Sequence, residues 1–188
     1  MSRATRRLAT ASFVLLPLAL AVVAGLSPAM SARFIEPFGA RGDASFRDVC
    51  PAGQYLTGLR VRSGAWLDQV AIRCQSLSGN TGAVHYGPAH GGDGGGPGEG
   101  HCPEGYMIRH MSFNMTAGNR QVISFTFRCE LPTDRSKFSA LKIGSSAQSP
   151  NPRPPIQYCL DGEAATGLAG RYGKHVNAAG LICDKLVR

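Results

Sequence analysis

Apolar and polar residues alternate along several short stretches of this 188-residue chain. Over residues 55–61 and 70–74, on either side of a Ser-Gly-Ala turn, apolar side chains tend to recur at every second position, which is typical of half-buried strands. The same tendency returns over residues 108–113, 125–129 and 179–183. None of these stretches is long enough for a helix, so the pattern predicts an all-β protein.

The predicted strands belong to a unit that occurs three times. Each copy opens as Cys-x-x-Gly and closes on a cysteine, at residues 50–74, 102–129 and 159–183. A glycine stands ten or eleven residues before each closing cysteine, at Gly64, Gly118 and Gly173. A single small sheet cannot bury its apolar face alone, so we expect one sheet per repeat around a shared core. The repeats cover about 34–78, 101–132 and 156–188.

The first 32 residues differ in composition from the rest. Three arginines precede an apolar run that ends in small residues, and these features are typical of a secretory signal peptide. A membrane anchor is the alternative interpretation, but Pro17 interrupts the apolar run. The sequence therefore predicts a signal peptide at 1–32 and a single secreted domain, extracellular or periplasmic, at 33–188.

Two segments between the repeats lack an apolar period. Residues 79–100 are rich in glycine and residues 145–155 are rich in proline, so we expect a flexible surface loop and an extended connector. Several side chains in or beside the glycine-rich segment could chelate a divalent metal: His85, His90, Asp93, Glu99 and His101. A flexible loop loses conformational entropy when it binds an ion, so no metal site and no cofactor are predicted.

All six cysteines follow the predicted leader, which indicates an oxidising compartment and a disulfide framework. Six cysteines allow about fifteen pairings. If each repeat closes on itself, the pairs are Cys50–Cys74, Cys102–Cys129 and Cys159–Cys183. The alternative of a zinc site fits poorly, because the chain has no Cys-x-x-Cys pair and no histidine at ligand spacing from two cysteines.

The charge of the chain limits the classes of partner that it can be expected to bind. The formal charge is +8, and removal of the leader takes three arginines and no acidic residue, which leaves 17 basic and 12 acidic residues and a charge of +5. The basic residues are scattered, without runs or interleaved aromatic residues, so specific nucleic-acid binding is not expected. Loose attraction to anionic surfaces, such as acidic polysaccharide or membrane, stays open.

Two families resemble this sequence. The runs PFGARGDASF and YLTGLRVRSGAWLDQVAI resemble the jacalin-related lectins, and the three cysteine-closed units with Cys-Pro-x-Gly openings resemble the vitelline membrane outer layer proteins. Both resemblances imply a β-prism over the whole mature chain, with three four-stranded Greek-key sheets around a pseudo-threefold axis. They also imply glycans or an extracellular polysaccharide as partners, without stable membrane insertion.

The lectin resemblance directs attention to a Gly-x-x-x-Asp loop, of which the first repeat has a full copy from Gly64 to Asp68. Gly64 allows a tight turn close to a ligand. The N–H groups of Ala65, Trp66 and Leu67 can donate to sugar hydroxyls, and the Asp68 carboxylate can accept from two of them. Trp66 can add an apolar platform for a sugar ring.

The other loops match this pattern less well. The resemblance implies that a loop from Gly39 to Gly42 completes the Gly64–Asp68 site. The third repeat has an amide instead of the carboxylate, so Gly173 and Asn177 form a weaker second site. The corresponding loop of the second repeat, at residues 118–122, has no carboxylate. The competing interpretation is that the Asp68 side chain only caps a turn and that Trp66 belongs to the core.

No signature of an enzyme is present. The sequence has no Gly-x-Ser-x-Gly motif and no His-Glu-x-x-His motif, and it has no free cysteine if the repeats close on themselves. We therefore expect a non-catalytic protein, either a lectin-like sugar binder or a structural protein of the same fold. A polysaccharide-acting enzyme is a third, weaker hypothesis.

Overall fold

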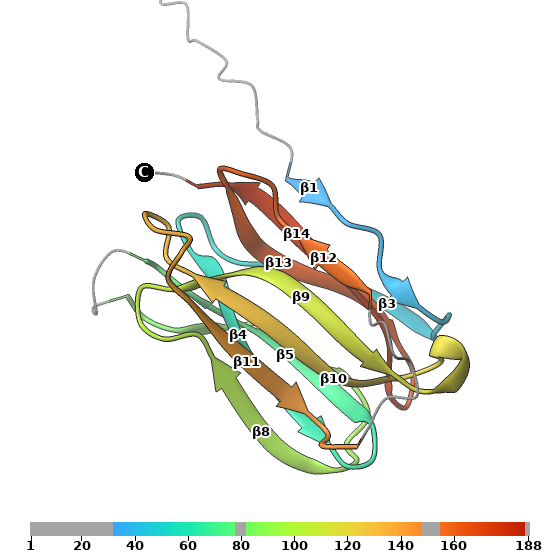
Figure 1. Ribbon diagram of the computed structural model, residues 1–188. Coiled ribbons are helices and arrows are strands. Elements are labelled where there is room, and N and C mark those ends of the chain that lie inside the picture. Colours follow the sequence, from blue (N-terminus) through green and yellow to red (C-terminus); the bar gives the residue numbers. More distant parts are fainter. Residues whose placement is uncertain (1–31, 78–81, 148–154, 187–188) are drawn as a thin grey trace, which may run out of the picture.

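The computed structural model describes residues 32–77, 82–147 and 155–186, and these form three antiparallel sheets wrapped around one core (Figure 1). Residues 1–31 of the predicted leader and residues 148–154 of the proline-rich connector lie outside these ranges. Within the described part, the one helical element is a 3₁₀ turn at Ala117–Asn119. The predicted all-β prism is confirmed.

Each sheet has a central hairpin with edge strands on both sides. The first sheet contains β4 (Tyr55–Ser63) and β5 (Leu67–Gln75), with β6 (His85–Tyr86), β7 (His90–Gly91) and β8 (Gly96–His101) at its edges. The second contains β9 (Met107–Met115) and β10 (Val122–Glu130), with β11 (Phe138–Gly144) and β12 (Ile156–Tyr158). The third contains β13 (Glu163–Tyr172) and β14 (Val176–Lys185), with β1 (Arg33–Phe34), β2 (Phe38–Gly39) and β3 (Ala44–Val49).

The edge strands correct two expectations about the chain's organisation. Residues 33–49 complete the third sheet rather than the first, because β1 and β2 pair with β14 and β3 pairs with β13; Figure 1 shows the first strand beside the last. Residues 79–100 were expected to form a flexible loop, yet β8 pairs with β4 over six residues, and β6 and β7 pair with β5. Backbone pairing orders this glycine-rich segment despite its missing apolar period.

The core lies between the inner faces of the three sheets. It is formed by the alternating apolar residues of all three hairpins, and within it the Phe125 ring contacts those of Phe113 and Phe127, with ring centroids 5.7 and 5.8 Å apart. All three phenylalanines are buried, and full burial of such a side chain stabilises the fold by roughly 1.5–3 kcal/mol.

Three disulfides close the prism, and the predicted pairing of each repeat on itself is confirmed. Each opening cysteine follows an edge strand of one sheet, while each closing cysteine lies inside the hairpin of the next sheet. Cys50–Cys74 therefore joins the third sheet to the first, Cys102–Cys129 joins the first to the second, and Cys159–Cys183 joins the second to the third. The bridges form a ring around the three sheets.

The threefold symmetry extends to the backbone beside the bridges. Each hairpin's first strand has a register shift, and the carbonyl of the residue at that shift accepts a hydrogen bond from the amide of an opening cysteine. The three bonds are Cys50 to Thr166 (2.7 Å), Cys102 to Thr57 (2.7 Å) and Cys159 to Arg109 (2.9 Å). These bulges fix where each edge strand meets the next sheet.

Candidate functional site

The turns of the three hairpins meet at one end of the prism. The first and third turns have the same backbone geometry, since Gly64 N donates to Trp66 O and Gly173 N donates to His175 O, both at 3.0 Å. His175 thus stands in the third turn where Trp66 stands in the first. The second turn differs because it contains the 3₁₀ segment. Contacts among these turns bring residues from distant parts of the chain into one site.

Asp68 lies at the centre of this end, just after the first turn. Its side chain is buried, with 7% of the residue exposed, and its Oδ1 accepts a hydrogen bond from His175 Nδ1 at 3.0 Å. The carboxylate faces the Gly94–Gly95 backbone and lies near Gly64, because a Cβ added at Gly94, Gly95 or Gly64 would lie 2.8, 2.6 or 3.9 Å from one of its oxygens. Asp68 therefore fixes the first turn against the third.

Trp66 is 42% exposed, so it is not a core residue. Its indole ring packs against the His175 imidazole in a T-shaped arrangement, with ring centroids 4.8 Å apart. Gly64 and Ala65 are exposed beside it, whereas Leu67 is fully buried and anchors the turn in the core. The exposed part of the turn is thus a short stretch of bare backbone next to an indole face.

The loop between β7 and β8 supplies the other wall of this site, and the sequence reasoning missed it. A Cβ on Gly94 would lie 2.8 Å from Asp68 Oδ1, and one on Gly95 would lie 2.6 Å from Asp68 Oδ2. Gly95 also has a φ of +60°, which favours glycine. The signal in the sequence was the Gly-Gly-Asp-Gly-Gly-Gly run, whose glycines allow this close approach to the carboxylate.

Gly39 and Gly42 lie elsewhere than predicted. Gly39 packs against Asn177 and Ala178 of β14, and a Cβ on Gly42 would lie 2.6 Å from Tyr172 backbone atoms. This loop therefore flanks the third turn and not the Gly64–Asp68 turn, because the N-terminal strands pair with the last hairpin. The proposed completion of the first site by these glycines is corrected accordingly.

The predicted second site around Gly173 and Asn177 is engaged in contacts within the protein. The Asn177 side chain donates from Nδ2 to the carbonyl of Arg120 in the second turn, at 3.0 Å. The carboxylate of the exposed Asp43 lies directly against Gly173. Asn177 thus links the third turn to the second, as Asp68 links the first to the third.

A second histidine–carboxylate pair supports the same end of the molecule. His90 Nε2 lies 2.9 Å from Asp48 Oδ2, and the His90 ring stacks on Phe46 with centroids 4.4 Å apart. Burial raises the pKa of Asp48, while the pairing with His90 acts in the opposite direction. Through His90, the segment that carries Gly94 and Gly95 is fastened to the third sheet.

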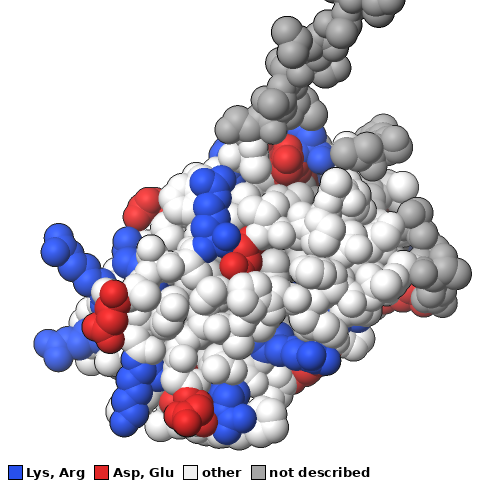
Figure 2. All heavy atoms as spheres, turned by 180° about the vertical axis from the view of Figure 1, so that it is seen from behind, with Lys and Arg blue, Asp and Glu red and all other residues white. Residues whose placement is uncertain are grey.

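Other features of the described residues bear on partners. Within the described ranges, no group of three or more His, Cys, Asp or Glu side chains is placed to hold a metal ion. None of the helical structure in the described part is long and apolar enough to cross a membrane. Figure 2 shows one face on which basic and acidic side chains stand near one another, with broad neutral areas between them.

Comparisons with known proteins identify the fold. No protein-family model matches the sequence, and no curated protein matches it either. Among solved structures, a Malaysian banana lectin aligns with a TM-score of 0.60 at 16% identity, covering 83% of this chain and 100% of the lectin. A mannose-binding jacalin-related lectin from Ananas comosus (0.58, 16%, 82% and 99%) and an agglutinin from Calystegia sepium (0.59, 17%, 84% and 98%) align similarly.

At these identities the likeness is one of fold: the chain is a jacalin-like β-prism. The resemblance to jacalin-related lectins that the sequence suggested is confirmed at this level. The resemblance to vitelline membrane outer layer proteins is not among these findings and stays a prediction.

Proposed function

We propose that this β-prism is a secreted, non-catalytic carbohydrate-binding protein that holds a sugar at the Gly64–Asp68 turn. The observation that carries the proposal is the exposed indole of Trp66, which lies beside bare turn backbone and an oriented carboxylate. An indole face can cover the C–H face of a sugar ring, while backbone N–H groups and a carboxylate satisfy its hydroxyls. The fold shared with lectins supports this assignment.

His175 and the Gly94–Gly95 backbone give the Asp68 side chain a fixed direction. A carboxylate held in advance loses little conformational entropy when a hydroxyl binds, which matters for a shallow site. One such site would bind a monosaccharide weakly, with a Kd around 1 mM or about 4 kcal/mol. The three disulfides support a location in an oxidising compartment, as the predicted signal peptide does.

A structural protein without sugar binding is the second candidate, and the burial of Asp68 favours it. In this alternative the Asp68–His175 contact only fastens two turns together, and Trp66 shields that contact from water. The two candidates differ in one respect, because only the first requires Trp66 and Asp68 to meet a ligand.

A glycan array with four proteins separates them. Trp66→Ala removes the platform, and Asp68→Asn keeps an acceptor for His175 but removes the charge. Phe138→Ala is the matched control, since Phe138 is an exposed aromatic residue on the second sheet. We expect wild type and Phe138→Ala to bind the same glycans, and both site variants to lose at least about tenfold in affinity. Blank arrays for folded wild type would favour the structural candidate, and unchanged binding of neutral glycans by Trp66→Ala would contradict a sugar site at the Gly64–Asp68 turn.

A further inference from the structure

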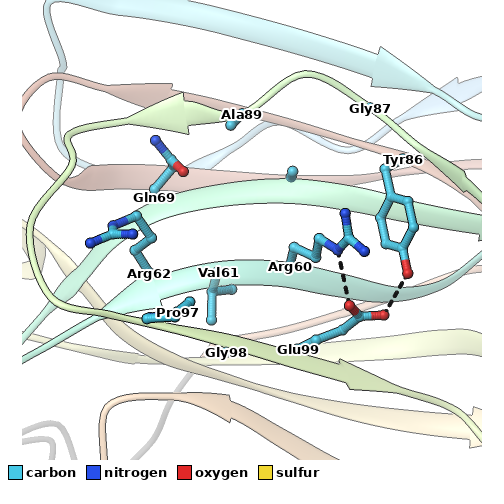
Figure 3. A pocket seen from close by; sticks show the side chains of 11 residues that line it. Arg60, Val61, Arg62, Gln69, Tyr86, Gly87, Ala89, Pro97, Gly98 and Glu99 are labelled. Carbon is cyan, nitrogen blue, oxygen red and sulfur yellow. Dashed lines mark hydrogen bonds and ion pairs between the residues drawn. The ribbon is translucent and has the colours of Figure 1, made fainter.

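The outer face of the first sheet has a groove of about 530 Å³, which Figure 3 shows from close by. Its floor is made of small residues, with Ala71 between the longer side chains of β5, Gly87 directly after β6 and Gly98 on β8. Ala89 lies exposed on the rim. The volume lies within the range of about 300–1,000 Å³ that small-molecule sites occupy.

One end of the groove is formed by a fixed polar cluster. Arg60 lies over the Tyr86 ring at 3.4 Å and donates from Nε to Glu99 Oε2 at 2.9 Å, and the Tyr86 hydroxyl donates to Glu99 Oε1 at 2.7 Å. Partial burial opposes ionisation of Glu99, but the hydrogen bonds from Arg60 and Tyr86 lower its pKa overall. Glu99 is therefore an acceptor held in place, with Arg60 as its neighbouring donor.

The other end is formed by Arg62 and Gln69, which lie opposite each other on β4 and β5. Arg62 donates from Nε to the carbonyls of Asp93 and Gly94 at 3.0 Å, and from Nη2 to the carbonyl of Gly95 at 2.7 Å. These partners are neutral, and in the described part of the chain no carboxylate forms an ion pair with Arg62. Its positive charge is thus held in place without being balanced.

The charge around this groove is positive but mixed. Arg60 and Arg62 line the groove together with a single carboxylate, Glu99. Glu99 pairs with Arg60 at 2.9 Å and with Arg73, a third guanidinium group beside the groove, at 3.4 Å. A bare inorganic anion would need only the cations. A ligand that carries both an anionic group and hydroxyls would use the guanidinium groups as donors and Glu99 and Gln69 as acceptors.

We propose that this groove binds an acidic saccharide, with the sugar carboxylate directed to Arg62 or Arg60 and the ring lying on the alanine and glycine floor. None of the residues that line it belongs to the Gly64–Asp68 turn. The groove is therefore a separate site, and one prism would present two binding surfaces. Linked surfaces of this kind raise the avidity for a polymer far above either affinity alone.

The test uses the whole mature protein and a short oligogalacturonate, with its methyl ester as the uncharged counterpart and phosphatidylserine vesicles as an anionic surface. Ala89→Glu places a negative charge on the groove rim. Ala140→Glu is the matched control, because Ala140 is an exposed alanine on β11 of the second sheet and the net charge changes equally. Arg60→Gln is a second groove variant, and thermal unfolding checks that each variant is folded.

We expect wild type and Ala140→Glu to bind the oligogalacturonate alike, while the methyl ester and the two groove variants lose at least about tenfold in affinity. Binding by the Trp66→Ala variant should equal that of wild type, which keeps this result independent of the turn site. The proposal is overturned if the acidic probe does not bind, if Ala89→Glu and Ala140→Glu behave alike, if the ester binds equally well, or if vesicles bind in place of the oligosaccharide.

Discussion

Removing one bridge of the disulfide ring should lower the free energy of unfolding by about 3.5 kcal/mol. The bridges close loops with sequence separations of 24, 27 and 24 residues. In the chain-entropy model the cost grows only with the logarithm of loop length, so the three loops give values within about 0.1 kcal/mol of one another. The perturbation is a pair of Cys→Ala substitutions at one bridge, made separately for each of the three.

Unfolding of the oxidised proteins in guanidinium chloride measures the lost free energy of unfolding. This loss equals the shift in the midpoint concentration multiplied by the slope m of the free energy against denaturant concentration. Hydrogen exchange gives a local readout, because the amide of each opening cysteine bonds to the neighbouring sheet. Loss of Cys50–Cys74 should accelerate exchange at position 50 more than at Cys102 or Cys159, and the other two variants should show the corresponding shifts.

The chain-entropy model requires the three variants to lose similar free energies of unfolding. A loss below about 1 kcal/mol at any one bridge, or losses that differ by several kcal/mol among the three, would refute it. A uniform loss without any local change in exchange would show that the bridges constrain only the unfolded chain and do not hold the sheets together.

Two further predictions concern single residues. Glu163 accepts hydrogen bonds from Arg33, and these bonds lower the pKa of the Glu163 carboxyl group. The stabilisation from this pair is therefore complete above the ordinary glutamate pKa of about 4.3, and it is lost as the pH falls through the lower pKa of the folded protein. Glu163→Gln should therefore cost about 1 kcal/mol at pH 7, and urea titrations should show the difference vanishing in acid. Gly95→Ala should lower the free energy of unfolding by more than about 2 kcal/mol, because the new Cβ meets Ser63 and Asp68. Gly53→Ala should lower it by only about 1 kcal/mol, because Gly53 has a φ of +77° but open space around it, and thermal unfolding measures both losses.

The sequence predicted the fold through its repeats. The apolar alternation placed the first two hairpins and the closing strand of the third, and the similar spacing of the cysteines in the three repeats gave the disulfide pairing, because both features are local and recur. The apolar alternation did not predict the edge strands. Gly96–His101 has no apolar alternation, and its order comes from backbone pairing with β4, a contact between segments far apart in the sequence.

The candidate site was predicted in part. The tight turn at Gly64 follows from residue types and spacing, whereas these left open whether Trp66 is exposed or belongs to the core. The pairing of Asp68 with His175 does not follow from them, since it joins residues 107 positions apart and depends on how the third sheet closes against the first. The misplacement of Gly39 and Gly42 has the same origin, because the N-terminal strands complete the sheet of the last hairpin.

Fluorescence titration tests the proposed sugar site most directly, because Trp66 is the single tryptophan of the chain. Wild-type protein is titrated with the neutral glycan that binds best on the array, while the emission of the indole is followed. The account predicts a saturable change in emission with the same Kd as the binding itself, and a weaker Kd in Asp68→Asn. Saturable binding that leaves the Trp66 emission unchanged would contradict it, because the sugar would then lie away from the Gly64–Asp68 turn.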